Sequence, residues 1–444
     1  MPGGSPKLRN IVLLLTSLVF YAWGEPVFVL ILITQCTLSW LLALLMDKYR
    51  GHRISKVILA MAVFVALSSL VVFKYADFFL LNLSYLLSSD IGLLGLVLPI
   101  GISFYTFQIL SYLIDLYRGK IKVSRSLLDF STYVAMFPQL VAGPIVQYSD
   151  VEQHLSKRSH SIEDVAVGVR RFVVGLGKKV LIANLMGELV DIYLNSGENS
   201  VLFSWLYVVA FALQIYFDFS GYSDMAIGLG RIFGFRFLEN FNYPYIAKSI
   251  TEFWRRWHIS LSTWFRDYVY IPLGGNRTSI SRHIFNIMAV WFLTGFWHGA
   301  AWNFIVWGLY FGLILLLEKF VLNRLLDKLP SFIRHSYVMF LVLISWVFFD
   351  AYNFMEIGIT LSRMFGFGAD SFAGVESLYY LRSYLVPILI GIIGSTPIPK
   401  LIAEKLSTKG IITVLEPLTI GVLLVAVTAF LVDGSFNPFI YFRF

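Results

Sequence analysis

Two histidines lie in strongly aromatic segments of the chain, and imidazole is the side chain best suited to acid–base chemistry near neutral pH. His258 follows the sequence EFWRRW, and His298 follows the sequence WFLTGFW. Such a histidine can take a proton from a hydroxyl group, although a lone histidine in an apolar segment is more often structural. Because both share one short region with several tryptophans and arginines, we interpret this region as a chemically equipped site.

The first histidine is expected on a helix that begins at Ser249. Glu252 follows this serine by three residues, which fits a capping box at a helix start. One continuous helix from there would place His258 on an aromatic and aliphatic face. The residues that share this face are Trp254, Trp257, His258, Leu261 and Phe265. The helix is expected to end at Pro272 and the glycine pair that follows it.

The second histidine is expected on an apolar helix, where Trp291 and Trp302 share its face. Gly295 and Gly299 form a G-x-x-x-G pair around His298, and the missing side chains allow close approach to the backbone. A neighbouring helix explains this pair as well as a substrate does, so both interpretations stay open.

Composition predicts an integral membrane protein. Of the 444 residues, 58% are hydrophobic and 14% are charged, and the mean hydropathy is +0.74. The chain offers about eleven apolar segments near the roughly 20-residue length of a membrane span, and no separate soluble domain. The net charge of +8 is attributed to basic cytoplasmic loops and not to nucleic-acid binding. The single cysteine, Cys36, excludes disulfides within the chain and cysteine metal sites.

The order of apolar and basic segments predicts the topology of the first part. Two apolar runs are interpreted as an uncleaved helical hairpin, because no small-residue cleavage site follows the first run. The basic loop at residues 47–56 predicts a cytoplasmic position for that loop and for the N-terminus. The next apolar runs cover residues 57–73 and 91–116.

Some apolar runs contain residues that interrupt a helix. Pro99 and Gly101 accompany the sequence SFYTFQILSYLID, whose polar side chains should face protein or water instead of lipid. Pro138 and Pro144 break the sequence FPQLVAGPIVQYSD, and broken backbone at membrane depth must be buried in protein or line a cavity. A re-entrant segment and a kinked span both fit this second pattern.

Aspartates at membrane depth need counter-charges, because an unpaired carboxylate is costly away from water. Asp218 and Asp224 are therefore expected to pair with nearby arginines. The candidates are Arg231, Arg255 and Arg256. Further cations flank a glycine turn and are expected to meet anionic lipid headgroups, with a phosphorylated cytosolic cofactor as the alternative. These cations are Arg170, Arg171, Lys178 and Lys179.

Several long motifs together resemble the membrane-bound O-acyltransferase family, in its alginate O-acetylase branch. The motifs are LPIGISFYTFQILSYLIDLYRG, FPQLVAGPIVQYSD, YFDFSGYSDMAIGLGRIFGF, FWRRWHISLSTWFRDYVYIPLGGNR, FWHGAAWNFIVWG and FIYFRF. The resemblance covers nearly the whole chain and implies one family domain over residues 1–444. It also implies an all-α polytopic membrane bundle of about eleven or twelve helices around a central tunnel, some of them broken or re-entrant.

The resemblance also implies roles for individual residues. His298 matches a near-universal histidine of the family and is expected to be the general base, and His258 matches a second frequently required polar residue. His258 and nearby polar groups are expected to orient the acceptor or to stabilise a thioester oxyanion. Candidates for lining the substrate path are Trp254, Arg256, Arg266, Asp267 and Asn303. Interfacial anchoring or ion pairing explains each of these equally well.

The same resemblance implies the substrates. Acetyl-CoA would be the acyl donor from the cytosol, with no bound cofactor and no metal. The acceptor would be an exported polysaccharide or an extracytoplasmic esterase-like acetyltransferase. The protein would be a multi-pass protein of the cell membrane, inner or cytoplasmic, among lipids.

Other function classes remain open from the sequence. One is a relative that transfers D-alanyl or another acyl group from a carrier protein to a cell-envelope polymer. Another is a transporter, which would explain broken helices equally well but predicts inverted internal repeats, and none is visible. The sequence shows no Walker loop, no G-x-S-x-G, no C-x-x-C and no H-E-x-x-H motif.

Overall fold

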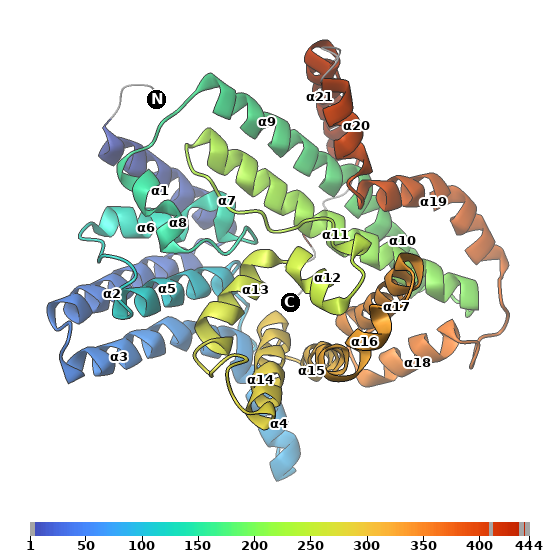
Figure 1. Cartoon of the computed structure of the whole chain (residues 1–444), viewed down its shortest axis with the longest axis horizontal. Helices are drawn as coiled ribbons and strands as arrows, with labels where there is room; N and C mark the ends of the chain where they lie inside the picture. Colours follow the sequence, from blue (N-terminus) through green and yellow to red (C-terminus); the bar gives the residue numbers. More distant parts are fainter. Residues whose placement is uncertain (1–4, 408–411, 435–438, 440–444) are drawn as a thin grey trace. The chain divides into compact units, whose positions relative to one another are not determined.

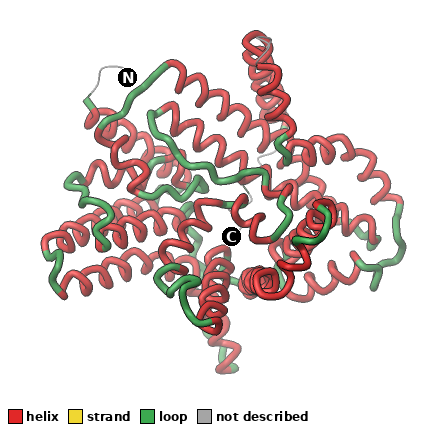
Figure 2. The backbone as a smooth tube through the Cα atoms, viewed as in Figure 1, coloured by secondary structure: helices red, strands yellow, loops and turns green. Residues whose placement is uncertain are grey.

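The computed structural model describes residues 5–407, 412–434 and 439, and these residues form helices and loops without a β-strand (Figures 1 and 2). In a bilayer the backbone must satisfy its own hydrogen bonds, so long apolar runs become helices. Among the described helices, seven segments are long and apolar enough to cross a membrane. They are Phe28–Lys48, Arg53–Leu87, Val201–Ile232, Trp302–Leu326, Ser331–Asp350, Val375–Gly394 and Leu415–Asp433. The predicted polytopic membrane bundle is therefore confirmed, whereas the tunnel stays a prediction.

The chain divides into two compact units. Unit 1 consists of Met1–Val169, Ala226–Glu239 and Arg266–Tyr268, and unit 2 consists of Arg170–Met225, Asn240–Phe265 and Val269–Phe444. The helices α9 (Ile162–Gly177) and α11 (Val201–Ile232) each contribute residues to both units. The prediction of one family domain over residues 1–444 stays a prediction.

Unit 1 contains the N-terminal helices. They are α1 (Pro6–Gly24), α2 (Phe28–Lys48), α3 (Arg53–Leu70), α4 (Ala76–Leu87), α5 (Ile102–Tyr117), α6 (Leu127–Ala135), α7 (Phe137–Leu140) and α8 (Tyr148–Ser156). The two helices of the predicted N-terminal hairpin are confirmed as α1 and α2. The π-helical segment Val71–Tyr75 joins α3 to α4, so this helix continues beyond the predicted end at residue 73.

The predicted apolar run over residues 91–116 is not one helix. Residues 90–99 have no regular secondary structure, and the Asp77 carboxylate accepts hydrogen bonds from the backbone N–H groups of Leu94 and Gly95. Gly101 then starts α5 with a φ of +75°, and a Cβ there would lie 2.3 Å from the Leu140 carbonyl oxygen. Glycine is needed at this position for both reasons.

The polar residues of α5 face protein, as predicted. Thr106 and Gln108 are fully buried, and Ser111 is 1% exposed. The break predicted after Phe137 is also confirmed, because α7 ends at Leu140 and α8 begins only at Tyr148. The choice between a re-entrant segment and a kinked span stays open.

Unit 2 contains the remaining helices. They are α10 (Asn184–Asn195), α12 (Ile250–Arg256), α13 (Ile259–Phe265), α14 (Ile280–His298), α15 (Trp302–Leu317), α16 (Asn323–Leu326), α17 (Ser331–Asp350), α18 (Phe354–Met364), α19 (Val375–Gly394), α20 (Ile398–Ser407) and α21 (Ile412–Asp433). Of the closing motif FIYFRF, only Phe439 lies within the described residues.

Both membrane-depth aspartates are paired with cations, as predicted, but the arginines named as candidate partners are wrong. Asp224 binds Arg171 at 2.8 Å and Lys178 at 2.6 Å, and Asp218 binds Lys179 at 2.5 Å. These three cations therefore bind aspartates of α11 instead of lipid headgroups. The fourth cation, Arg170, binds Glu416. The predicted partner Arg231 binds Asp164, and Arg256 binds Glu252.

A close helix contact explains this pairing. A Cβ on Gly175 would lie 2.6 Å from the Gly221 carbonyl oxygen, and a Cβ on Gly221 would lie 2.8 Å from the Gly175 carbonyl oxygen. The two glycines therefore allow the backbones of α9 and α11 to touch. This contact brings the cations near Lys178 within reach of Asp224.

The ion pair between Lys179 and Asp218 is expected to be important for stability. Its side chains are 9% and 3% exposed, and removal of one partner from a buried pair typically costs about 3–5 kcal/mol. Replacement of Asp218 by alanine should therefore lower the apparent melting temperature of the purified protein clearly. Glu404→Ala is the matched control, because Glu404 pairs with Lys400 at an exposed position and exposed pairs contribute only about 0–1 kcal/mol. Equal melting temperatures for the two variants would contradict this role of the buried pair.

Candidate functional site

The helix expected to carry His258 is broken at the histidine. The helix α12 ends at Arg256, Trp257 is extended, and α13 begins at Ile259. His258 itself has a φ of +43°, in the left-handed region that side-chain-bearing residues rarely adopt. The prediction of one continuous helix through His258 is therefore wrong. Strained backbone of this kind persists where surrounding contacts enforce it, and it is often found at functional sites.

The start of α12 is fixed by several caps. The Ser249 hydroxyl accepts the Glu252 backbone N–H at 3.0 Å, as predicted, whereas the Glu252 carboxylate accepts the N–H of Lys248 at 2.9 Å. The buried Glu318 carboxylate accepts the backbone N–H groups of Ile250 and Thr251 at 2.6 and 3.0 Å. Carboxylates at a helix N-terminus bind the free N–H groups and interact favourably with the helix dipole.

Asn240 holds the break in place from 18 residues upstream. Its side-chain oxygen Oδ1 accepts hydrogen bonds from the backbone N–H of Ser260 at 3.2 Å and from the Ser260 hydroxyl at 2.9 Å. The same oxygen lies 3.2 Å from Nδ1 of His258. The amide nitrogen of Asn240 donates to the hydroxyl of Ser223 at 3.2 Å. Asn240 and His258 are both fully buried.

This network fixes the tautomer of His258. A backbone N–H can only donate, so the Asn240 atom that receives the Ser260 N–H is an acceptor. Nδ1 of His258 must then carry the proton that it donates to Asn240, and Nε2 carries the lone pair. His258 lies outside the seven candidate spans, and burial lowers the pKa of its imidazole to about 3. At neutral pH His258 is therefore a neutral imidazole whose Nε2 can accept a hydrogen bond.

His298 is the last residue of α14 and is 4% exposed. Its ring is packed edge to face against three aromatic rings, with centroid distances of 5.0 Å to Trp297, 5.0 Å to Trp307 and 5.3 Å to Phe349. A site enclosed by aromatic side chains has a low local dielectric, which strengthens electrostatic interactions inside it.

Trp297 connects the two histidines. Its ring centroid lies 5.0 Å from that of His298 and 6.0 Å from that of His258. The ring centroid of Phe219 of α11 lies 4.7 Å from that of His258. The structure therefore places both sequence-predicted histidines in unit 2, on one aromatic cluster.

The glycines around His298 serve the contact between α14 and α15. A Cβ on Gly295 would lie 2.2 Å from the Phe304 carbonyl oxygen, and a Cβ on Gly308 would lie 2.2 Å from the Trp291 carbonyl oxygen. A Cβ on Gly299 would lie 2.2 Å from the Phe304 ring. Of the two open interpretations of the G-x-x-x-G pair, these contacts favour a neighbouring helix.

Replacement of Gly308 by alanine is expected to displace α15 from α14 and so to move His298. Because a misplacement of about 1 Å can cost about 10²-fold in rate, activity should fall by more than about tenfold. Gly358→Ala in α18 is the matched control, since nothing lies within 4 Å of a Cβ at that position. The check is a comparison of initial rates for the two variants at equal amounts of folded protein, and equal rates would contradict the expected effect.

Two further predicted residues, Trp254 and Asn303, lie in the same unit. Trp254 is 7% exposed, and its ring centroid lies 5.7 Å from that of Trp307, which contacts His298. Asn303 donates from Nδ2 to the carbonyl oxygens of Phe348 and Ala351 at 3.3 and 2.9 Å. Asn303 thus ties the start of α15 to the end of α17.

The remaining predicted residues form ion pairs. Arg256 binds the Glu252 carboxylate at 2.9 Å and donates to the Asn242 carbonyl oxygen at 3.0 Å. Arg266 and Asp267 belong to unit 1, where they form a bidentate ion pair. Nε and Nη2 of Arg266 lie 2.7 and 3.1 Å from the two carboxylate oxygens of Asp267. A role of these three residues in substrate binding stays a prediction.

Comparison with known proteins decides the family. The family model of the membrane-bound O-acyltransferases matches residues 17–365. The chain belongs to the membrane-bound O-acyltransferase family. It is therefore an acyltransferase, and both histidines lie within the matched region.

Similar proteins of this family differ in their polymer substrates. A probable alginate O-acetylase of Pseudomonas aeruginosa is 41% identical over 367 residues, 82% of this chain and 71% of that protein. The peptidoglycan O-acetyltransferase of Helicobacter pylori is 33% identical over 398 residues, 83% of this chain and 76% of that protein. The teichoic acid D-alanyltransferase of Bacillus subtilis is 31% identical over 252 residues, 53% of this chain and 63% of that protein.

Sequence reasoning missed several residues of this candidate site. They are Ser223, Asn240, Ser260, Trp297, Trp307 and Phe349. Asn240 is one of two asparagines in the sequence LENFNYPY, and nothing in its spacing from His258 marks it. Trp297 could have been found, because it is the direct neighbour of His298.

The described part of the chain also bears on metal binding. Within residues 5–407, 412–434 and 439, no three His, Cys, Asp or Glu side chains lie together in a way that could hold a metal ion. The chemistry available from the described side chains at this site is that of imidazoles, hydroxyls and amides.

Proposed function

We propose that this membrane enzyme transfers an acetyl group from cytosolic acetyl-CoA towards an exported polysaccharide, with His298 as the general base. The acceptor is either a sugar hydroxyl or an extracytoplasmic esterase-like acetyltransferase, and the protein lies in the inner membrane. The observation that carries the proposal is the burial of two histidines on one aromatic cluster in a chain of this family. The names of the two O-acetyl-transferring relatives support acetyl as the acyl group and a polymer as its destination.

The proposed reaction needs one proton to move. The acceptor hydroxyl oxygen attacks the thioester carbonyl carbon, and the imidazole of His298 takes the hydroxyl proton. The new C–O bond forms and the C–S bond breaks. The imidazolium then donates this proton to the leaving thiolate. The net reaction yields an ester and free CoA thiol.

The tautomer of His258 supports a specific part in this reaction. Nε2 has no proton to donate when Nδ1 donates to Asn240, so it cannot stabilise an oxyanion. It can accept a hydrogen bond from an incoming hydroxyl group. Of the two roles expected for His258, orientation of the acceptor is therefore favoured.

Transfer of D-alanyl or another acyl group from a carrier protein is the second candidate. The same attack on a thioester would serve both donors, so the chemistry of the site favours neither. Transfer of acetyl from acetyl-CoA is the preferred proposal, because the match to the alginate O-acetylase covers 82% of the chain, whereas the match to the D-alanyltransferase covers 53%. A transporter without acyl chemistry is not proposed, because the family is that of acyltransferases.

The proposal is tested with sealed membrane vesicles of known orientation that contain the protein and its acceptor. Acetyl-CoA with a radiolabelled acetyl group is added to the external medium of two preparations, one of inside-out and one of right-side-out vesicles. Label should appear in acceptor ester only when the cytosolic face is exposed to acetyl-CoA. Label from an acyl carrier protein but not from acetyl-CoA would establish the second candidate, and label with neither donor would overturn both.

A further inference from the structure

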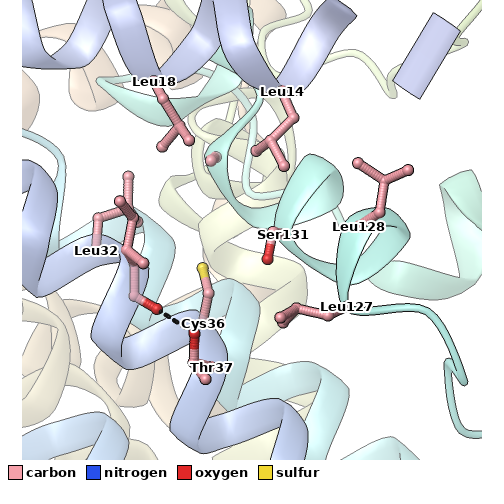
Figure 3. Close-up of a pocket in the computed structure, with 10 residues that line it drawn as sticks. Leu14, Leu18, Leu32, Cys36, Thr37, Leu127, Leu128 and Ser131 are labelled. Carbon is pink, nitrogen blue, oxygen red and sulfur yellow. Dashed lines mark hydrogen bonds between the residues drawn. The ribbon is translucent and has the colours of Figure 1, made fainter. Parts of the chain in front are cut away.

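A cavity of about 310 Å³ lies in unit 1 between α1, α2 and α6 (Figure 3). Its floor is closed, because Leu32, Cys36 and Ala135 are each 2% exposed or less. Its rim is open at Ile33, which is 42% exposed. The cavity contains none of the residues assigned to the acyl-transfer site.

The lining is apolar, and its few polar groups are already used. Leucine, isoleucine and alanine side chains form most of the wall, and the other residues are Cys36, Thr37 and Ser131. The Thr37 hydroxyl donates to the Ile33 carbonyl oxygen at 2.8 Å, and the Cys36 thiol contacts the Ser131 hydroxyl. A bound water needs two to four polar partners, so this lining disfavours water.

The depth of the cavity in the membrane indicates what fills it. The helix α2 is one of the seven candidate spans, and Cys36 lies about 12 Å along it at 1.5 Å per residue. The hydrocarbon core of a bilayer is about 30 Å thick, so Cys36 lies near its middle. At this depth the solvent at an open apolar rim is the acyl chains of lipids.

The volume also fits hydrocarbon. An engineered aliphatic cavity of about 150 Å³ stays dry and binds benzene, and the cavity of unit 1 is larger. An empty space of this size would forfeit the dispersion contacts of its lining. We infer that the acyl chain of a bilayer phospholipid inserts between α1, α2 and α6 and fills this cavity.

The test uses wild-type protein in vesicles of phosphatidylethanolamine and phosphatidylglycerol, with a small fraction of phosphatidylethanolamine that carries a diazirine in the middle of one chain. After irradiation, lipid adducts are mapped by mass spectrometry. Adducts should be enriched several-fold at Leu14, Cys36 and Leu128 over Val386 and Leu389, exposed residues of the candidate span Val375–Gly394. No enrichment over these two positions would overturn the inference.

A pair of variants tests whether the chain enters the cavity itself. Ser131→Leu adds bulk to the wall of the cavity and should lower the adducts at Leu14 and Cys36 several-fold, while adducts at Val386 persist. Ser131→Ala removes the same hydroxyl without filling the space and should keep them. Adducts at Leu14 and Cys36 that are undiminished in folded Ser131→Leu protein would overturn the inference. If this variant does not fold, the comparison within the wild-type protein decides.

Discussion

Replacement of His298 by alanine is expected to lower the rate of acyl transfer by at least about 10²-fold, because general-base catalysis typically contributes about 10²–10⁴-fold. The ring of His298 is buried among Trp297, Trp307 and Phe349 and is only 4% exposed, so bulk water is a poor replacement for the base. The loss should appear in kcat, since a general base acts in the transition state and not in ground-state binding. The measurement is the initial rate of ester formation by purified protein in lipid vesicles.

His283 provides the matched control for this variant. It lies on the same helix α14, is 5% exposed, and contacts the hydroxyl of Tyr270 at 3.0 Å and the ammonium of Lys319 at 3.0 Å. His283→Ala removes an equally buried imidazole that belongs to a different cluster. It should keep most of the activity, and a loss as large as that of His298→Ala would mean that the effect is structural.

Asn240 is expected to be a positioning residue for His258, and its replacement should have the second largest effect. In Asn240→Leu the acceptor for the Nδ1 proton is gone, so His258 can adopt the other tautomer and its Nε2 no longer presents a fixed lone pair. Loss of the group that sets a catalytic histidine's tautomer can be very costly, and we expect a decrease of at least about tenfold. The measurement is the initial rate of Asn240→Leu and of the wild type, compared at equal amounts of folded protein.

A change in pH dependence separates this positioning from a packing effect. In the wild type, burial lowers the pKa of His258 to about 3, so the imidazole stays neutral and gives no inflection between pH 5 and 8. Asn240→Asp places a carboxylate beside Nδ1, which raises the pKa of His258 and favours its protonation. The rate of this variant should fall as the pH drops through the raised pKa, because protonated Nε2 cannot accept a hydrogen bond. A profile of the wild-type shape would contradict the positioning role.

The membrane bundle and the position of two histidines among aromatic residues could be predicted from the sequence, because both depend on local information. Long apolar runs usually become helices in a membrane, although the run over residues 91–116 is only partly helical. A histidine within an apolar run stands out. The packing of α5 was predictable for the same reason, since Gln108 and Ser111 cannot face lipid.

The break at His258 could not be predicted, because it depends on a distant residue. Helical periodicity alone extends the helix through Trp257, and the left-handed conformation of His258 is held by Asn240. The hydrogen bonds to Ser260 that compensate this conformation exist only after the chain has folded back.

The ion pairs were mispredicted for a related reason. Proximity in sequence suggested arginines after Asp224, whereas its partners Arg171 and Lys178 come from before it. They reach Asp224 because Gly175 and Gly221 let two backbones touch. Small residues at a helix contact are visible in a sequence, but which pair of glycines meets is not.

The most direct test of the proposed function is transfer of radiolabelled acetyl from acetyl-CoA by purified protein, measured for the wild type and for His298→Ala with His283→Ala alongside. Ester formation and release of CoA thiol are followed together in each reaction. Wild type and His283→Ala should produce ester and thiol in equal amounts, and His298→Ala should produce neither above background. Equal ester formation by His298→Ala and wild type would contradict the assignment of His298 as the base.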